Sequence, residues 1–189
     1  MTTSSFTLML SLSTSSCEPP MIVNHQRLTV ARDQGFVVFL IGARLNKWWL
    51  LPVVWGVAMA MRRMLGELQA NPDSGLLAFE EYGGRTTLML QYWRSREDLL
   101  RYARDKERAH APAWRRWIRE WGEGAVGIWH ETYVVEPGSY ECVYQHMPAF
   151  GLGKVGPLVP AEGPLKTAAG RLAAGAERGA RLQEDAQAA

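Results

Sequence analysis

The chain has 189 residues, of which 47% are hydrophobic and 21% charged, a composition that suits one globular domain with room for terminal extensions. Its formal net charge of +2 argues against a nucleic-acid-binding protein, since such proteins usually carry a strongly basic face. The two cysteines, Cys17 and Cys142, lie far apart in the sequence, so we expect no disulfide framework and a cytoplasmic location.

Residues 1–34 are expected to form a disordered leader. The apolar run at 6–12 has no basic residue before it, which a secretory signal normally requires, and Met21 is an alternative start. A second apolar stretch, 48–61, has only 14 residues and contains Pro52, whereas a helix that spans a bilayer needs about 20. We therefore expect no stable membrane span.

The following elements are expected in the order β-α-β-β-α-β, which is that of a ferredoxin-like α+β domain. Continuous apolar runs indicate the strands, a Gly-Gly turn at 83–85 indicates a hairpin, and apolar residues three or four apart indicate the helices. Ser95 and Asp98 resemble a capping pair at a helix start. The expected strands are 36–43, 76–82, 86–93 and 127–135, and the expected helices begin at Pro52, Ser95 and about Pro112.

We place this domain at residues 35–156 and predict that it forms a homodimer. A four-stranded sheet with helices on one side leaves its other side bare, yet strands 86–93 and 127–135 carry apolar residues on both faces. A second copy packed sheet to sheet about a two-fold axis would cover that side. Residues 139–156 are interpreted as a short strand or an arm across the dimer, and the Ala- and Gly-rich residues 157–189 as a mostly disordered tail.

Five stretches of the chain carry recognisable sequence words. They are FVVFLIGARLNKWW (36–49), RTTLMLQYWRSREDLLRYARD (85–105), HAPAWRRW (110–117), VGIWHETYVVEPGSYECVYQHMP (126–148) and FGLGK (150–154). Together, and in this order, they resemble the family of small proteins named after the fumagillin-pathway monooxygenase of fungi. The resemblance implies a dimeric α/β barrel related to antibiotic-biosynthesis monooxygenases and haem-degrading enzymes. Family members more usually have Asn at the position of His146.

His130 and Glu131 are the most prominent candidate site residues, because they lie side by side in an otherwise apolar strand. Side chains alternate along a strand, so one of the two faces the helices or solvent and the other faces the dimer cavity. His130 is a candidate general base or haem ligand. The alternative is that it donates a hydrogen bond to a carbonyl inside the core, and Glu131 is open to the same structural interpretation.

A second group of candidates lies where the first strand gives way to the first helix. In related cofactor-free oxygenases, polar and aromatic side chains at this rim hold an electron-rich substrate, which makes Arg44 and Asn46 candidate catalytic residues. A helix cap with two packing tryptophans is the alternative. The candidate substrate-binding residues are Trp48, Trp49, Arg85, Tyr92, Trp93, Trp129, Glu131 and His146. Eight tryptophans favour an aromatic-walled pocket, and they fit a stacked dimer core almost as well.

The leading hypothesis is a monooxygenase-like enzyme of secondary metabolism that oxidises an apolar polyene or aromatic metabolite with molecular oxygen. It would need no tightly bound cofactor, and His130 would be the base. One rival is a haem enzyme, for haem degradation or aldoxime dehydration, in which His130 or His110 ligates iron. The other rival is a ligand-binding or sensor protein without catalysis. Nucleotide-binding loops and zinc-type spacings are missing from the sequence, so we expect no metal site and a flavin only as a diffusing substrate.

Overall fold

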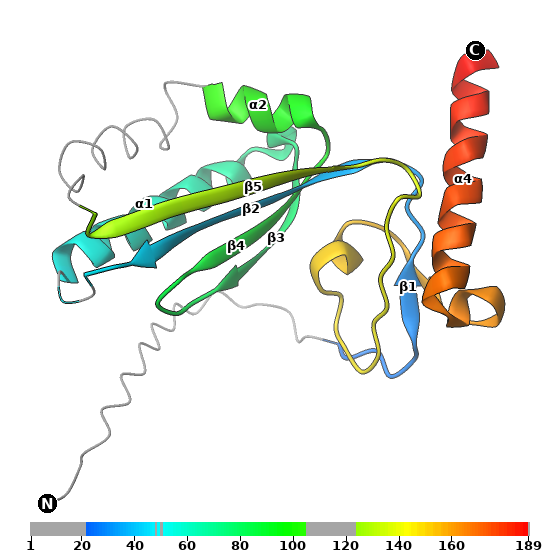
Figure 1. The fold of residues 1–189 in the computed structure, drawn as a ribbon, viewed down its shortest axis with the longest axis horizontal. Helices are drawn as coiled ribbons and strands as arrows, with labels where there is room; N and C mark the ends of the chain where they lie inside the picture. Colours follow the sequence, from blue (N-terminus) through cyan, green and yellow to red (C-terminus); the bar gives the residue numbers. More distant parts are fainter. Residues whose placement is uncertain (1–21, 48, 50, 105–123, 189) are drawn as a thin grey trace, which may run out of the picture.

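An antiparallel four-stranded sheet, in the order β3-β4-β2-β5, forms the centre of an α+β domain (Figure 1). The computed structural model describes residues 22–47, 49, 51–104 and 124–188. The β-branched and aromatic runs form the strands, as predicted from the sequence. These strands are β2 (Phe36–Leu45), β3 (Leu76–Tyr82), β4 (Leu88–Trp93) and β5 (Val126–Val135).

Two helices cover one side of this sheet (Figure 1). The first, α1 (Leu51–Ala70), has Pro52 in its first turn, where the missing N–H costs no helical hydrogen bond. It ends before the short helix η1 (Pro72–Ser74), and the left-handed Gly75 (φ 86°) then leads into β3. Both helix starts that fall on described residues are confirmed, and the helix expected from Pro112 lies outside the described residues. No helix in the described part of the chain is long and apolar enough to cross a membrane.

The second helix, α2 (Arg96–Arg104), begins with the predicted capping pair. The Asp98 backbone N–H donates to Ser95 Oγ at 3.1 Å, which satisfies one of the free donors of the first turn. The Asp98 carboxylate accepts from Arg94 Nε at 2.8 Å and also pairs with Arg101. The hydrogen bond from Arg94 holds the pKa of this carboxyl below its usual value. The start of α2 is thereby tied to the end of β4.

The helix side and the opposite side of the sheet each bury a separate cluster. On the helix side, Val37 and Trp93 pack against Leu68 of α1 and Leu99 of α2. The opposite side packs both on residues before the sheet and on the C-terminal part of the chain. The buried residues of this second cluster are Val30, Phe36 and Leu152. Because Val37 and Phe36 are neighbours on β2, alternation along this strand assigns every second residue to each cluster.

Two expectations about the ends of the chain are wrong. Within the expected leader, Leu28–Val30 form β1, which pairs with β6 (Leu158–Pro160) of the expected tail. The tail also forms the short helix η3 (Gly163–Lys166) and the long helix α4 (Ala168–Ala188), which Figure 1 shows beside β1.

Glycines in α4, which suggested disorder, are points of close contact. A Cβ added at Gly175 would lie 2.5 Å from the Gly138 carbonyl oxygen, so the absent side chain allows the helix to reach the turn after β5. Arg171 is buried and donates to Glu141 at 2.6 Å and to the Leu165 carbonyl at 2.8 Å. These long-range contacts order a segment whose local composition favours disorder.

Residues 139–156 fold back on their own chain instead of leaving it as an arm. Leu28 and Tyr144 exchange two backbone hydrogen bonds of 2.8 Å, and Asn24 N–H donates to the Met147 carbonyl at 3.0 Å. The segment then forms the short helix η2 (Gly151–Lys154), whose Leu152 belongs to the cluster beneath the sheet. Within its own chain the segment thus packs beside β1 and beneath the sheet, and its expected contact across a dimer stays a prediction.

Replacing Gly42 with alanine is expected to destabilise the fold by about 1–3 kcal/mol, as over-packed sites do. The new Cβ would meet the Thr87 carbonyl oxygen and lie 2.7 Å from Trp129 Nε1. The matched control is Gly66→Ala in α1, where nothing lies within 4 Å and alanine should stabilise by about 1 kcal/mol. Urea unfolding measures both changes, and equal effects of the two substitutions would contradict the packing argument.

Candidate functional site

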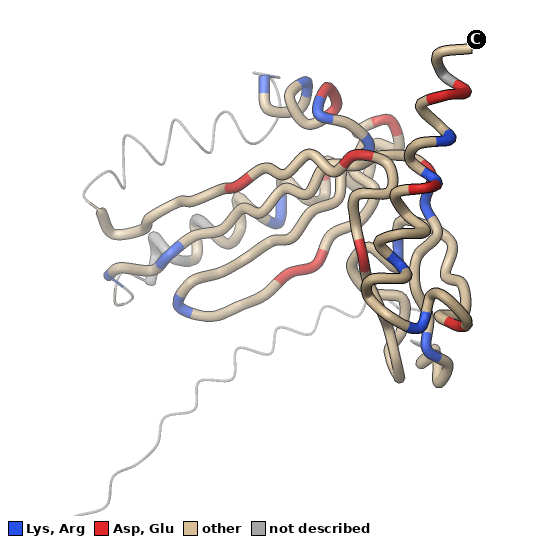
Figure 2. The backbone as a smooth tube through the Cα atoms, turned by 45° about the vertical axis from the view of Figure 1, so that its right-hand side comes forward, with Lys and Arg blue, Asp and Glu red and all other residues tan. Residues whose placement is uncertain are grey.

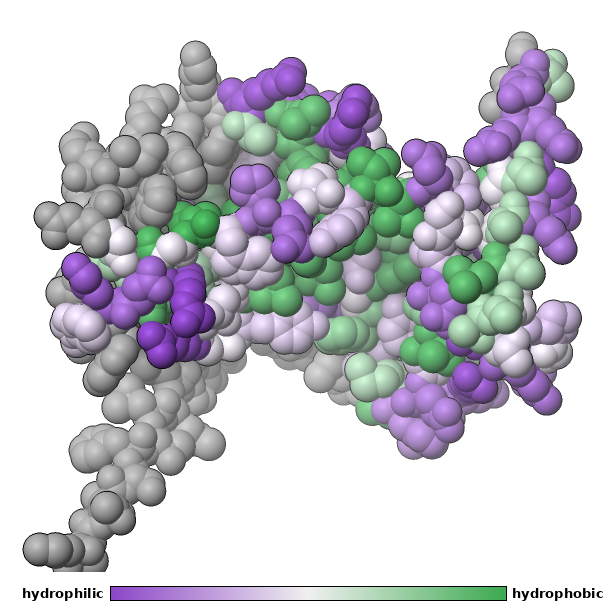
Figure 3. All heavy atoms as spheres, in the orientation of Figure 1, coloured by the Kyte–Doolittle hydropathy of each residue, from purple (hydrophilic) through white to green (hydrophobic). Residues whose placement is uncertain are grey.

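The side of the sheet that faces away from the helices is covered only in part. The β1–β6 pair and η2 cover the end near Phe36, whereas the rest of this side carries a row of partly buried and exposed side chains. In Figure 3 hydrophobic atoms gather over the strands in the middle of the face shown. The strand register places the following residues on the uncovered part, which we call the open face: Leu40, Tyr82, Leu88, Leu90, Trp129, Glu131 and Tyr133.

Few charged residues project from this side of the sheet: Glu131 lies within the open face, and Arg44 and Glu80 lie at its margins. Figure 2 shows the strands mostly in tan, with charged residues at few positions, whereas α4 carries both signs along its length. Tyr133 is 51% exposed and Tyr82 41% exposed, which are high values for aromatic side chains on a sheet. An apolar surface of this kind on a sheet is typical of a protein or ligand contact.

Trp129 lies on the open face above Gly42, its partner in the β2–β5 register. The indole Nε1 is buried and has no hydrogen-bond partner among the described residues. A buried donor without an acceptor costs about 1–3 kcal/mol. The packing of the indole on Gly42 therefore comes at the cost of this hydrogen bond among the described residues.

Glu131 and Tyr133 form a hydrogen-bonded pair on the same face. Tyr133 Oη donates to Glu131 Oε2 at 2.6 Å, and both side chains are exposed. This bond to the carboxylate, together with its negative charge, raises the pKa of the Tyr133 phenol. The pair is the strongest polar feature of the open face.

His130 points to the helix side and Glu131 to the open face; the alternation predicted only that the two side chains lie on opposite sides of the sheet. His130 is the register partner of Ile41, and its ring centroid lies 5.8 Å from that of Phe39. The imidazole is exposed and makes no hydrogen bond to any residue that the structure describes. The alternative of a core histidine bonded to a carbonyl therefore gains no support within the described residues.

The rim candidates make contacts that hold the end of the sheet together. Arg44 donates to Thr86 Oγ1 at 2.9 Å, and Asn46 Nδ2 donates to the Gly124 carbonyl at 3.2 Å. Arg85 Nε donates to the Leu45 carbonyl at 3.4 Å, and Trp49 is 60% exposed. Trp48 lies outside the described residues.

The remaining candidates lie apart from this rim. Trp93 is fully buried on the helix side, where its Nε1 donates to Gln91 Oε1 at 2.9 Å, so it packs in the core. Tyr92 lies beneath η2, and burial raises the pKa of its phenol. His146 lies on the segment that pairs with residues 24–28. The sequence candidates are thus distributed over both sides of the sheet, its rim and this segment.

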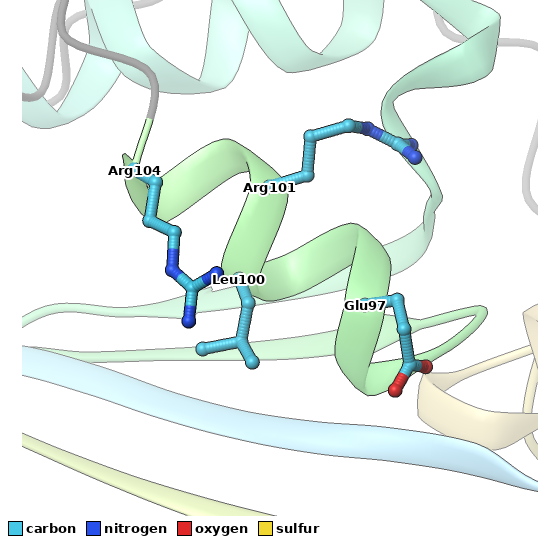
Figure 4. Close-up of a pocket in the computed structure, with 4 residues that line it drawn as sticks. All are labelled: Glu97, Leu100, Arg101 and Arg104. Atoms are coloured by element: carbon cyan, nitrogen blue, oxygen red, sulfur yellow. The ribbon is translucent and has the colours of Figure 1, made fainter.

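Two hollows that the sequence did not predict lie on the helix side and at the β3 edge. Figure 4 shows the first, of about 540 Å³, lined by Glu97, Leu100, Arg101 and Arg104 of α2. The second, also about 540 Å³, runs along β3 between the end of α1 and Lys154. A leucine at position 100 among the charged residues of α2 is the one weak signal in the sequence for the first hollow, and the structure shows that this leucine is exposed. Among the described residues, no group of three or more possible metal-ligating side chains occurs.

The α+β fold and the exposed aromatic side chains of the open face define the class of a small α+β domain with an exposed apolar sheet surface. Comparison with known sequences then assigns the family. Residues 36–152 match the family described as Monooxygenase af470-like. The match covers more than half of the chain, which therefore belongs to this family, as the five sequence words predicted.

Individual relatives are more distant. The chain is 29% identical over 93 residues to Monooxygenase af470 of Aspergillus fumigatus, a stretch that covers 46% of this chain and 33% of that protein. The chain thus spans about a third of the length of this curated relative. Two solved structures are similar at a TM-score of 0.36 each. One is a conserved protein of unknown function and possible oxidoreductase from Bacteroides thetaiotaomicron (13% identity, 53% of this chain, 98% of that chain). The other is a protein from Shewanella oneidensis (10% identity, 65% of this chain, 96% of that chain).

Glu131→Gln is expected to lower the pKa of Tyr133 towards the ordinary tyrosine value of about 10, because the carboxylate no longer favours the protonated phenol. The change is measured by following tyrosinate absorbance in the ultraviolet as the pH rises. Because the chain has six tyrosines, the titration curve of Tyr133→Phe is subtracted to give the contribution of Tyr133. Glu136→Gln, at the exposed position after β5, is the control. An unchanged titration in Glu131→Gln would show that the pair does not form in solution.

Proposed function

We propose that the protein is a cytoplasmic, monooxygenase-like enzyme that oxidises an apolar polyene or aromatic metabolite of secondary metabolism. It uses molecular oxygen and no tightly bound cofactor, and it works as a homodimer of the dimeric α/β-barrel type. Membership of the Monooxygenase af470-like family supports the reaction class. The aromatic and aliphatic side chains of the sheet support an apolar substrate.

The unpaired His130 imidazole carries the catalytic part of the proposal. It is exposed on the helix side, it packs beside the Phe39 ring, and no hydrogen bond within the described residues occupies it. A general base needs a free lone pair within reach of the substrate, and a neighbouring aromatic ring provides a surface for a flat substrate. The hollow beside α2 lies on this same side of the sheet.

The proposed reaction balances without an external reductant. His130 removes a proton from an activated CH₂ group, and the resulting carbanion forms a C–O bond with O₂. The peroxide takes up a proton and then loses water as the second C–H and the O–O bond break. The carbon becomes a carbonyl, so the substrate supplies the electrons that reduce one oxygen atom to water. Arg44 and Asn46 remain proposed as further polar groups at the rim.

The sheet order supports the ferredoxin-like and dimeric part of the proposal. In the order β3-β4-β2-β5 every neighbouring pair is antiparallel. A ferredoxin-like βαββαβ chain has the same arrangement, with its first and third strands in the centre and its second and fourth at the edges. The open face presents leucines from two strands beside Trp129. In a two-fold dimer the open faces of the two copies would pack against each other, so that apolar side chains meet apolar side chains.

His130→Gln is expected to lower oxygen uptake with polyene or phenolic substrates by about 100-fold or more, which is the usual loss when a general base is removed. Thr132→Ala, at an exposed position on the same side of β5, should leave uptake within about twofold of wild type. Oxygen-electrode assays of a substrate panel measure both. Equal turnover in wild type and His130→Gln would rule out the base. A Soret band that forms with added haemin and is lost in His130→Ala would replace this proposal with the haem enzyme.

Leu90→Arg is expected to convert the dimer to a monomer, because it introduces a charge at the centre of the open face. Light scattering should give about twice 21.2 kDa for wild type and the single-chain mass for the variant. Leu172→Arg, at a 48% exposed position of α4, should remain dimeric. A monomeric wild type would remove the dimer from the proposal without affecting the test of His130.

A further inference from the structure

Two imidazoles from distant parts of the sequence face each other, away from His130 and the rim residues Arg44 and Asn46. His25 precedes β1 and His146 lies 121 residues later, yet their Nδ1 atoms are 3.4 Å apart. The ring centroids are 5.7 Å apart and the ring planes meet at 64°. Both side chains are exposed. The proposed oxidation uses neither residue.

The backbone holds this pair in place. Asn24 N–H donates to the Met147 carbonyl at 3.0 Å, and this antiparallel bridge makes His25 and His146 facing neighbours. A second contact, between Leu28 and Tyr144, fixes the two segments a few residues further on. His146 has φ 52°, a left-handed conformation that few residues other than glycine adopt. The surrounding bridges therefore impose the position of its side chain.

We propose that His25 and His146 form a binding site for a divalent transition-metal ion, of which Zn²⁺ is the representative. Two nitrogen ligands at 2.0–2.1 Å from a tetrahedral zinc lie roughly 3.4 Å from each other. The two Nδ1 atoms already have this separation, although they point at one another. Because both rings are exposed, a small rotation about their side-chain bonds turns the two lone pairs towards a common ion.

The ligand types decide the class of ion. Neutral imidazole suits zinc, nickel and copper, whereas magnesium and calcium require oxygen ligands. The described residues supply two ligands and no third histidine, cysteine or carboxylate at this place, so water completes the coordination and the ion exchanges readily. The bound ion links the first described residues to the segment that covers one end of the sheet. Its role is structural, and it is independent of the proposed oxidation.

Isothermal titration of the full-length protein with Zn²⁺ tests the site, with Mg²⁺ as the ion that should not bind. His25→Asn and His146→Asn should each weaken Zn²⁺ binding by about 100-fold, because the second ligand of a linked pair raises the local concentration by at least this factor. Asparagine is chosen at position 146 because it tolerates the left-handed conformation. Circular dichroism should show unchanged folding in both variants.

His130→Asn, which removes an exposed histidine with no imidazole neighbour among the described residues, is the matched control and should bind Zn²⁺ as wild type does. Zinc should also raise the melting temperature of wild type and of His130→Asn, and not that of the two paired-site variants. Zinc binding that is equal in wild type, His25→Asn and His146→Asn would overturn the proposal, as would binding that depends on His130.

Discussion

The register between β2 and β5 is the constraint on which the rest of the structure depends. Ten residues of each strand pair, from Phe36 with Val135 to Leu45 with Val126. If β5 slipped by one residue against β2, every side chain of β5 would move to the other side of the sheet, because side chains alternate along a strand. His130 would then leave the helix side, Trp129 would lose its place above Gly42, and the two hydrophobic clusters would mix.

Steric fit between Gly42 and Trp129 helps to specify this register. The indole occupies the space that a side chain at position 42 would fill, so the bulkiest residue of β5 lies opposite the glycine of β2. The same fit removes Nε1 from water without giving it an acceptor in the described residues. Packing and hydrogen bonding of Trp129 thus favour different arrangements at this position.

The sheet and its flanking helices were predictable because they rest on local patterns. The apolar run of β2, the Gly-Gly turn before Arg85 and the Ser95 cap each act over a few residues. The alternation of His130 and Glu131 was equally predictable, since it follows from strand geometry alone. Their assignment to particular sides required the packed helices, because only Leu68 and Leu99 mark which side is the core.

The ends of the chain and the histidine pair were not predictable, because long-range contacts decide them. Leu28–Val30 become a strand only when Leu158–Pro160 lie beside them, and α4 is held by Gly175 against Gly138 and by the buried Arg171. These contacts join residues that lie 30 or more positions apart in the sequence.

The sequence by itself therefore determined the family, the four central strands and the alternation of their side chains, since periodicity and local words carry this information. Tertiary structure alone decided which side of the sheet His130 faces and that His25 meets His146. The physical reason is that side-chain period is a property of a single strand, whereas burial and proximity arise only when separate segments pack.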